Sequence, residues 1–212
     1  MVIEGEALFA EAMEEPLSMS MSEAMSHMSK LYENSSPEDI GETAREISEL
    51  ALRIIERESQ NGVGKMKEIR FYRTKEPFGC FSNFSAHIFF IDDIAWPTVE
   101  HYYQAMKFDD PEFRDEIRGI PSPMTAKQHA YTRPPREGWE EERDEVMMIG
   151  LRAKFSQHED LRRVLLETGD AIIIEDSPID SYWGCGSDGL GENMLGKMSM
   201  RIRDEIKESE CQ

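Results

Sequence analysis

The residue types best suited to chemistry gather in two short segments, Trp96 to Phe108 and Asp180 to Gly196. In the first segment Thr98 is a good helix N-cap, which puts Glu100 in the first helical turn. The positive end of the helix dipole favours an ionised carboxylate at that place. Since residues three and four apart share a helix face, Lys107 lies on the same side as Glu100. An acid and an amine in this arrangement fit either a binding site or an ordinary exposed helix face.

The second segment is a loop with four glycines within eight residues, which is either mobile or brings its backbone close to another group. Asp180 can stabilise a developing positive charge, and Trp183 offers a flat face for a heterocycle. A half-buried Trp183 packed into the core is the alternative. The stretch Gly184 to Gly189 fits the G-x-G-x-x-G pattern, but we reject a dinucleotide fold because only one helix remains after it. Its amides could still hold a phosphate at the helix start.

Four other side chains are candidates for contact with a ligand. Asn83 lies between two phenylalanines and can donate a hydrogen bond to a base or sugar, or belong to a plain turn. Trp139 begins a predicted helix either as a core anchor or as a stacking surface. Arg73 and Lys154 are either solvated charges or clamps for an anion.

Composition limits the classes of ligand and compartment. A net charge of -19 provides no basic stripe for an extended nucleic-acid footprint, although a few placed cations can hold a small anion. The three cysteines form no CxxC pair and the five histidines no HxxxH pair, so neither a disulfide framework nor a metal site is expected. No stretch approaches the roughly 18 apolar residues of a membrane helix, and the start is acidic, so we expect a cytoplasmic protein without a membrane partner.

The chain divides into a short N-terminal part and one larger domain. Residues 1–35 are rich in methionine, serine and glutamate and are expected to be weakly structured. Residues 36–60 form a predicted amphipathic helix capped by Ser36, followed by a linker at residues 61–66. The apolar stripe of this helix packs on its own domain or against a second copy, with a separate partner as the less favoured alternative. The main domain is predicted to span residues 67–208.

Within the main domain, helical patterns outnumber strand patterns. Strands are predicted at residues 69–72, 87–91 and 171–175. Helices are predicted at residues 98–108, 111–118, 124–131, 139–155, 159–168 and 193–208. We therefore expect the α+β class: a helix-dominated single domain with a small β-sheet, plus an N-terminal helical extension.

Taken in order, these segments resemble the NADAR family, described as N-glycosidases of riboflavin-biosynthesis intermediates. The resemblance covers nearly all of residues 69–208 and leaves residues 1–65 outside. Its longest motifs are Phe81-Ser82-Asn83-Phe84, Trp96-Pro97-Thr98, Glu100-His101-Tyr102, Leu151-Arg152-Ala153-Lys154-Phe155 and Tyr182-Trp183-Gly184.

The resemblance implies hydrolysis of an N-glycosidic bond between ribose, as its 5-phosphate or in ADP-ribose, and an amino-pyrimidine or guanine. It implies Glu100 and Asp180 as the catalytic acids, with no metal and no cofactor. By position, it implies Trp183, Trp139, Asn83, Lys107 and Lys154 as substrate-binding residues. Lys107, Lys154 or Arg73 is expected to neutralise the phosphate. By analogy with sugar hydrolases, Glu100 would stabilise positive charge on the ribose or activate water, and Asp180 would bind sugar hydroxyls or act as the second acid or base.

The chain departs from the family pattern at one place. Family members commonly have a Gly-Arg pair where this chain has Ala130-Tyr131, and its nearest arginine is Arg133. The expected partner is a small phosphorylated ribosyl-base or ADP-ribosyl substrate, including a single ADP-ribosylated guanine, without extended nucleic-acid binding. A non-catalytic module that binds ADP-ribose or a nucleotide is the alternative, and a homo-oligomer formed through the N-terminal helix stays open.

Overall fold

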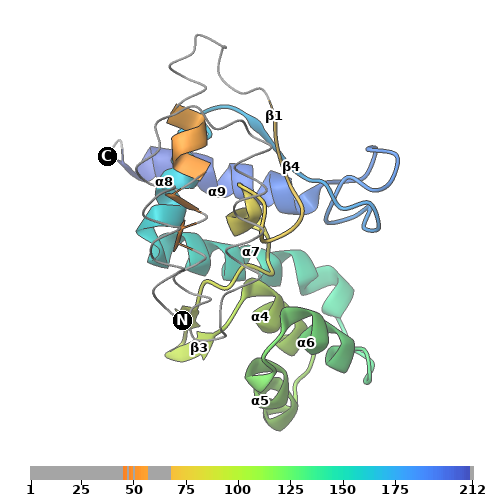
Figure 1. Cartoon of the computed structure of the whole chain (residues 1–212). Coiled ribbons are helices and arrows are strands. Elements are labelled where there is room, and N and C mark those ends of the chain that lie inside the picture. The colour runs from red at the N-terminus through yellow and green to blue at the C-terminus, as the bar shows by residue number, and fades with distance from the viewer. Residues whose placement is uncertain (1–44, 47, 50, 57–67, 211–212) are drawn as a thin grey trace, which may run out of the picture.

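The long helix α7 (Trp139–Gln157) crosses the middle of the computed structural model, which describes residues 45–46, 48–49, 51–56 and 68–210 (Figure 1). Three helices lie on one side of it, namely α4 (Val99–Ala105), α5 (Pro111–Gly119) and α6 (Pro123–Ala130). On the other side lie α8 (Glu159–Glu167) and α9 (Met194–Glu210), together with two of the strands.

The strands form two separate pairs. β1 (Glu68–Phe71) runs parallel to β4 (Ile172–Glu175), with Phe71 opposite Glu175. β2 (Phe89–Ile91) and β3 (Ile94–Trp96) are antiparallel. Helices dominate the described residues, which confirms the α+β class.

The sequence did not predict β3, and this has a local cause. Asp92 and Asp93 join β2 to β3 with φ angles of 51° and 62°. A tight hairpin turn needs such left-handed backbone at both central residues, and aspartate adopts it less readily than glycine. Two adjacent aspartates were therefore a weak turn signal before a strand of only three residues.

The six helices predicted in the main domain are all present, with ends that differ by a few residues. The predicted N-cap Thr98 is confirmed, because its Oγ1 accepts a hydrogen bond of 3.2 Å from the backbone N–H of His101. α4 stops at Ala105, three residues earlier than predicted. The carbonyl of Lys107 instead accepts from the backbone N–H of Arg136, which ties the end of this segment to the start of α7.

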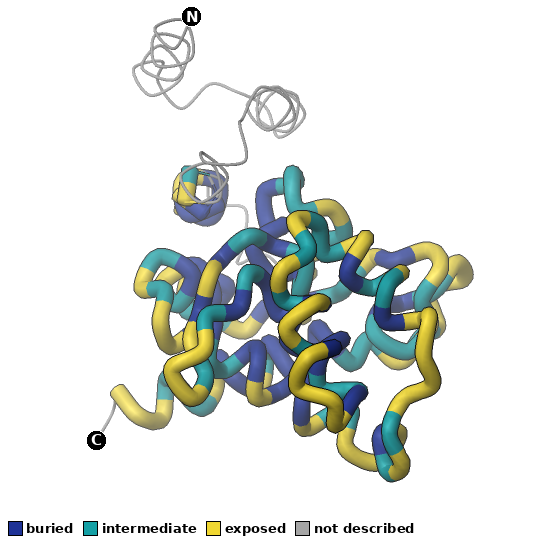
Figure 2. The backbone as a smooth tube through the Cα atoms, turned by 90° about the horizontal axis from the view of Figure 1, so that it is seen from below, coloured by how far each residue is buried: buried dark blue, intermediate teal, exposed yellow. Residues whose placement is uncertain are grey.

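The core follows α7 and its neighbours. Phe81 packs against Phe71 and Phe155 at ring-centroid distances of 5.9 and 6.1 Å, and all three rings are fully buried. Burying one such side chain stabilises a fold by about 1.5–3 kcal/mol. Buried and exposed stretches alternate along the tube drawing, as they do in helices that turn one face to the core (Figure 2).

The described residues between 45 and 56 are helical and lie against the main domain. Ala51, Leu52 and Ile55 join its hydrophobic core. Of the alternatives for this helix, packing on its own domain accounts for these contacts. The predicted cap Ser36, residues 1–35 and the linker at residues 61–66 lie outside the described residues. Across the part of the chain that is described, no helix has both the length and the apolar character needed to cross a membrane.

Candidate active site

Glu100 lies in the first turn of α4 and is only 2% exposed. Its backbone N–H donates to the carbonyl of Asn83, at 2.9 Å. Both carboxyl oxygens accept hydrogen bonds from amide side chains: Oε2 from Asn83 at 2.5 Å and Oε1 from Gln104 at 2.6 Å. An acid so fully buried and so tightly held is too precisely placed for an ordinary helix face.

The charge state of Glu100 is set by opposing influences. Burial raises the pKa of Glu100, while Lys127, the amide of Gln104 and Lys107 lower it. The negative charge of Asp180 raises it again. Burial is the largest of these influences, so the pKa of Glu100 lies above its ordinary value, and the amide of Gln104 and the two cations oppose that rise.

The loop after β4 presents Asp180 to the same region. Its Oδ1 accepts from the backbone N–H groups of Tyr182 and Trp183, at 3.0 and 2.8 Å. The ring of Trp183, three residues after Asp180, meets that of Tyr103, three residues after Glu100, at 5.5 Å between centroids. This contact places the Asp180 loop beside α4, and the negative charge of Asp180 raises the pKa of Glu100.

An aromatic wall lines this region. The ring of Tyr103 meets Trp139 edge to face at 5.0 Å and Trp183 at 5.5 Å between centroids. Trp139 is 3% exposed and belongs to the core, so it acts as the anchor that was one of its two predicted roles. Trp183 is only partly buried and keeps surface for a ligand.

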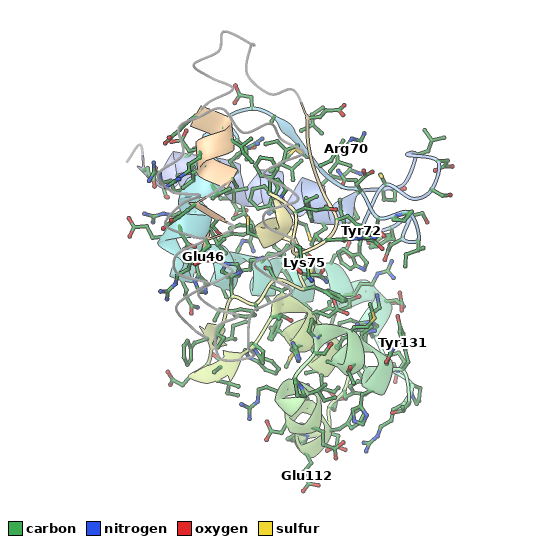
Figure 3. All side chains as sticks on the ribbon, in the orientation of Figure 1. Glu46, Arg70, Tyr72, Lys75, Glu112 and Tyr131 are labelled. Atoms are coloured by element: carbon green, nitrogen blue, oxygen red, sulfur yellow. The ribbon has the colours of Figure 1, made fainter. Side chains whose placement is uncertain are left out.

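Lys107 lies at the edge of the aromatic wall. Its Nζ is 5.4 Å from the ring centroid of Tyr103, 5.8 Å from that of Trp139 and 5.0 Å from that of Tyr131. Burial lowers the pKa of Lys107, and the charge of Glu100 opposes this. Tyr131 itself is 67% exposed at the end of α6 (Figure 3). Rings around a cation hold it in place while leaving its protons free for an anion.

Comparison with known proteins decides the family. A sequence profile of the NADAR domain matches residues 70–207. The chain belongs to the NADAR family. N-glycosidase YbiA of Escherichia coli K12 is 45% identical over 140 residues, which cover 65% of this chain and 88% of that protein. N-glycosidase Npun_R5314 of Nostoc punctiforme is 44% identical over 144 residues, covering 66% and 92% of the two chains.

The solved structure of Escherichia coli YbiA, determined by NMR, agrees with the fold. It has a TM-score of 0.65 and 41% sequence identity, covering 69% of this chain and 89% of that one. The maize protein named Riboflavin biosynthesis protein PYRR is 41% identical over 155 residues, but these are only 25% of its own length. The predicted family and enzyme class are confirmed: this NADAR protein is an N-glycosidase.

Two residues of this NADAR protein that were predicted to bind phosphate make other contacts in the structure. Lys154 is fully buried, and its Nζ donates to the carbonyls of Cys80 and Ser82 and to Oγ of Ser85, at 2.5, 2.9 and 2.7 Å. Burial lowers the pKa of Lys154 to about 7, whereas these three acceptors favour its charged form. All three ammonium protons are engaged, so Lys154 fixes the loop that carries Asn83 and has no proton left for a phosphate.

Arg73 is the second of these residues, and its contact with a phosphate stays a prediction. It is exposed in the turn after β1, where its backbone N–H donates to the Glu76 carboxylate. In the glycine-rich loop, the backbone N–H groups of Cys185, Gly186 and Gly189 donate to the carbonyls of Glu175, Asp180 and Gly186. Those of residues 191–195 donate to carbonyls of residues 181–185. That amides of this loop hold a phosphate at the helix start stays a prediction.

Sequence reasoning missed two charged residues of the site, Glu175 and Lys127. Burial raises the pKa of Glu175 to about 7, with further increases from Asp180 and Glu100 and an opposing effect of Lys127. Lys127 acts on the pKa of both glutamates. The acid that ends the Ile-Ile-Ile run was the available signal for Glu175, since an acid seldom continues a buried strand.

Proposed function

We propose that this N-glycosidase hydrolyses the bond between C1′ of a ribose and a nitrogen of an amino-substituted pyrimidine or guanine. The ribose carries a 5-phosphate or is part of ADP-ribose. The observation that carries the proposal is the buried Glu100 carboxylate, held by two amides and close enough to Asp180 to respond to its charge. Two relatives named riboflavin biosynthesis proteins make an amino-pyrimidine riboside the first substrate to test.

The proposed chemistry places positive charge on the sugar. As the C1′–N bond lengthens, the ribose develops oxocarbenium character, which an adjacent carboxylate stabilises. Glu100 does this and takes a proton from the water that attacks C1′. The amides of Asn83 and Gln104 keep the carboxylate in one orientation, so it need not reorganise when charge appears.

The remaining residues of the site bind the substrate. Asp180 still has Oδ2 for the ribose hydroxyls, because the two backbone N–H groups occupy Oδ1. Trp183 presents aromatic surface to the heterocycle, and the buried ring of Tyr103 supports it edge to face. Lys107 and Lys127 supply the positive charge that a phosphate requires, in place of Lys154 and Arg73.

Glu100→Gln tests the proposal directly. The substitution keeps the shape of the side chain but removes its charge, so kcat should fall at least about 100-fold with the fold intact. Glu112→Gln, at an exposed position of α5 (Figure 3), is the matched control and should keep wild-type activity. Hydrolysis by Glu100→Gln at the wild-type rate would remove Glu100 from the mechanism.

One assay separates the substrate classes. The protein is incubated with phosphoribosylamino-pyrimidine, ADP-ribosyl-guanosine and NAD, and the products are identified by mass spectrometry. Release of a free amino-pyrimidine or of guanine supports the proposal. Tight binding of all three compounds without release of a base would instead favour the non-catalytic binding module.

A further inference from the structure

Glu175 ends β4 with its side chain on the inner face of the strand. Side chains alternate along a strand, so Glu175 shares its face with Ile173, which is fully buried. Its backbone is fixed on both sides, since its N–H donates to Asn193 Oδ1 at 2.9 Å and its carbonyl accepts from Cys185 N–H at 2.8 Å. A carboxyl group is thus directed inward from a rigid position.

The charged groups that act on Glu175 come from three other elements. They are Asp180 in the loop, Glu100 on α4 and Lys127 on α6. Three carboxyl groups therefore share one partly buried region with limited positive charge. Like charges so placed do not all ionise together, and the group with the fewest donors keeps its proton.

Hydrogen bonding distinguishes the three acids. Glu100 accepts from two side-chain amides, and Asp180 accepts from two backbone N–H groups. These donors stabilise a carboxylate. Oε2 of Glu175 is buried and has no hydrogen-bond partner among the described residues. A protonated carboxyl can donate as well as accept, so this oxygen fits a proton held for a ligand.

We propose that Glu175 is the general acid that protonates the leaving base, an assignment that rests on the proposed function. The C1′–N bond breaks, its electron pair goes to the nitrogen, and that nitrogen takes the proton of Glu175. The water oxygen bonds to C1′ while one water proton passes to Glu100. The products are a ribose with a C1′ hydroxyl and a neutral base, and solvent returns the proton from Glu100 to Glu175.

Glu175→Gln tests this assignment through activity as a function of pH. Rates with phosphoribosylamino-pyrimidine are measured from pH 5 to 9. Wild-type kcat/KM should fall as the pH rises through about 7, because Glu175 loses its proton there. Glu175→Gln should be at least about 100-fold slower and should lack this alkaline decline. Glu208→Gln, exposed on α9, is the matched control.

Each outcome bears on the assignment. A Glu175→Gln enzyme with wild-type kcat/KM, or one that keeps the wild-type alkaline decline, overturns it. If Glu175→Gln does not fold, Glu175→Asp tests the assignment instead. This variant should keep part of the activity and should still show the fall of kcat/KM at alkaline pH. Carbon-13 NMR of labelled glutamate gives a readout without substrate: a Glu175 carboxyl already ionised at pH 6 overturns the assignment. If the wild type releases no base from any substrate, the proposed function itself fails.

Discussion

At the scale of single residues, the site depends on giving similar carboxyl groups different surroundings. Glu100 is held by the amides of Asn83 and Gln104, whereas Glu175 has a buried oxygen without a donor in the described structure. Burial raises the pKa of both glutamates, but only the first has compensating donors. Such a difference can separate the base of a hydrolytic reaction from its acid.

Asn83→Ala tests the donor on Glu100. Loss of a hydrogen bond to a charged group costs about 1.5–3 kcal/mol, so the pKa of Glu100 should rise further. The acid limb of kcat/KM should therefore move to higher pH, with activity at pH 5 reduced about tenfold or more. Gln128→Ala, exposed on α6, should leave the profile unchanged. An unshifted acid limb in Asn83→Ala would show that this amide does not control Glu100.

At the scale of elements, α9 lies directly on β4 and so fixes the strand that carries Glu175. A Cβ atom built at Gly196 would overlap the carbonyl oxygen of Ile173. Asn193, just before α9, makes two hydrogen bonds to β4. Its side chain donates to the Ile173 carbonyl and accepts from the Glu175 N–H. The helix and the strand therefore approach closely enough to exclude any side chain at Gly196.

Gly196→Ala should destabilise the protein by several kcal/mol or prevent folding. The new methyl group meets backbone rather than a movable side chain, so β4 and α9 must separate. Gly119→Ala is the matched control, because a Cβ atom at that helical glycine meets nothing within 4 Å. Its stability should change by less than about 1 kcal/mol. Urea unfolding of both variants checks the difference, and equal midpoints would contradict the close packing.

At the scale of the whole molecule, Glu175, the proposed general acid, makes the free energy of unfolding depend on pH. The ordinary pKa of a glutamate is 4.5, and that of Glu175 in the folded protein is about 7. Between these two values the folded protein holds a proton that the unfolded chain has released. The free energy of unfolding of the wild type should therefore fall as the pH rises from 4.5 to about 7.

Glu175→Gln should remove this pH-dependent fall in the free energy of unfolding, because glutamine does not ionise. At pH 8 the variant should be more stable than the wild type by about 3 kcal/mol, while at pH 4 the two should be nearly equal. Thermal unfolding at the two pH values, followed by circular dichroism, measures both differences. A difference that is the same at pH 4 and pH 8 would show that Glu175 titrates normally in the fold. A gain in stability together with a loss of activity is typical of a functional acid.

Local patterns in the sequence were enough for much of the fold and part of the site. Helix positions followed from apolar spacing and caps such as Thr98, because these depend on residues within one or two turns of each other. Glu100 and the Asp180 loop were recognisable by their residue types. The ordered motifs from Phe81 to Gly184 were specific enough to indicate the family, which the profile match over residues 70–207 confirms.

Only the tertiary structure decided how distant segments meet. The parallel pairing of β1 with β4 joins residues about a hundred positions apart, and it places Glu175 where the charge of Glu100 acts on its pKa. Lys154, which the sequence suggested as a phosphate ligand, is buried beneath the loop that carries Asn83, and its ammonium group is bonded to that loop. Residue spacing along the chain does not predict such contacts, because burial and interactions between charges arise only when separate elements pack together.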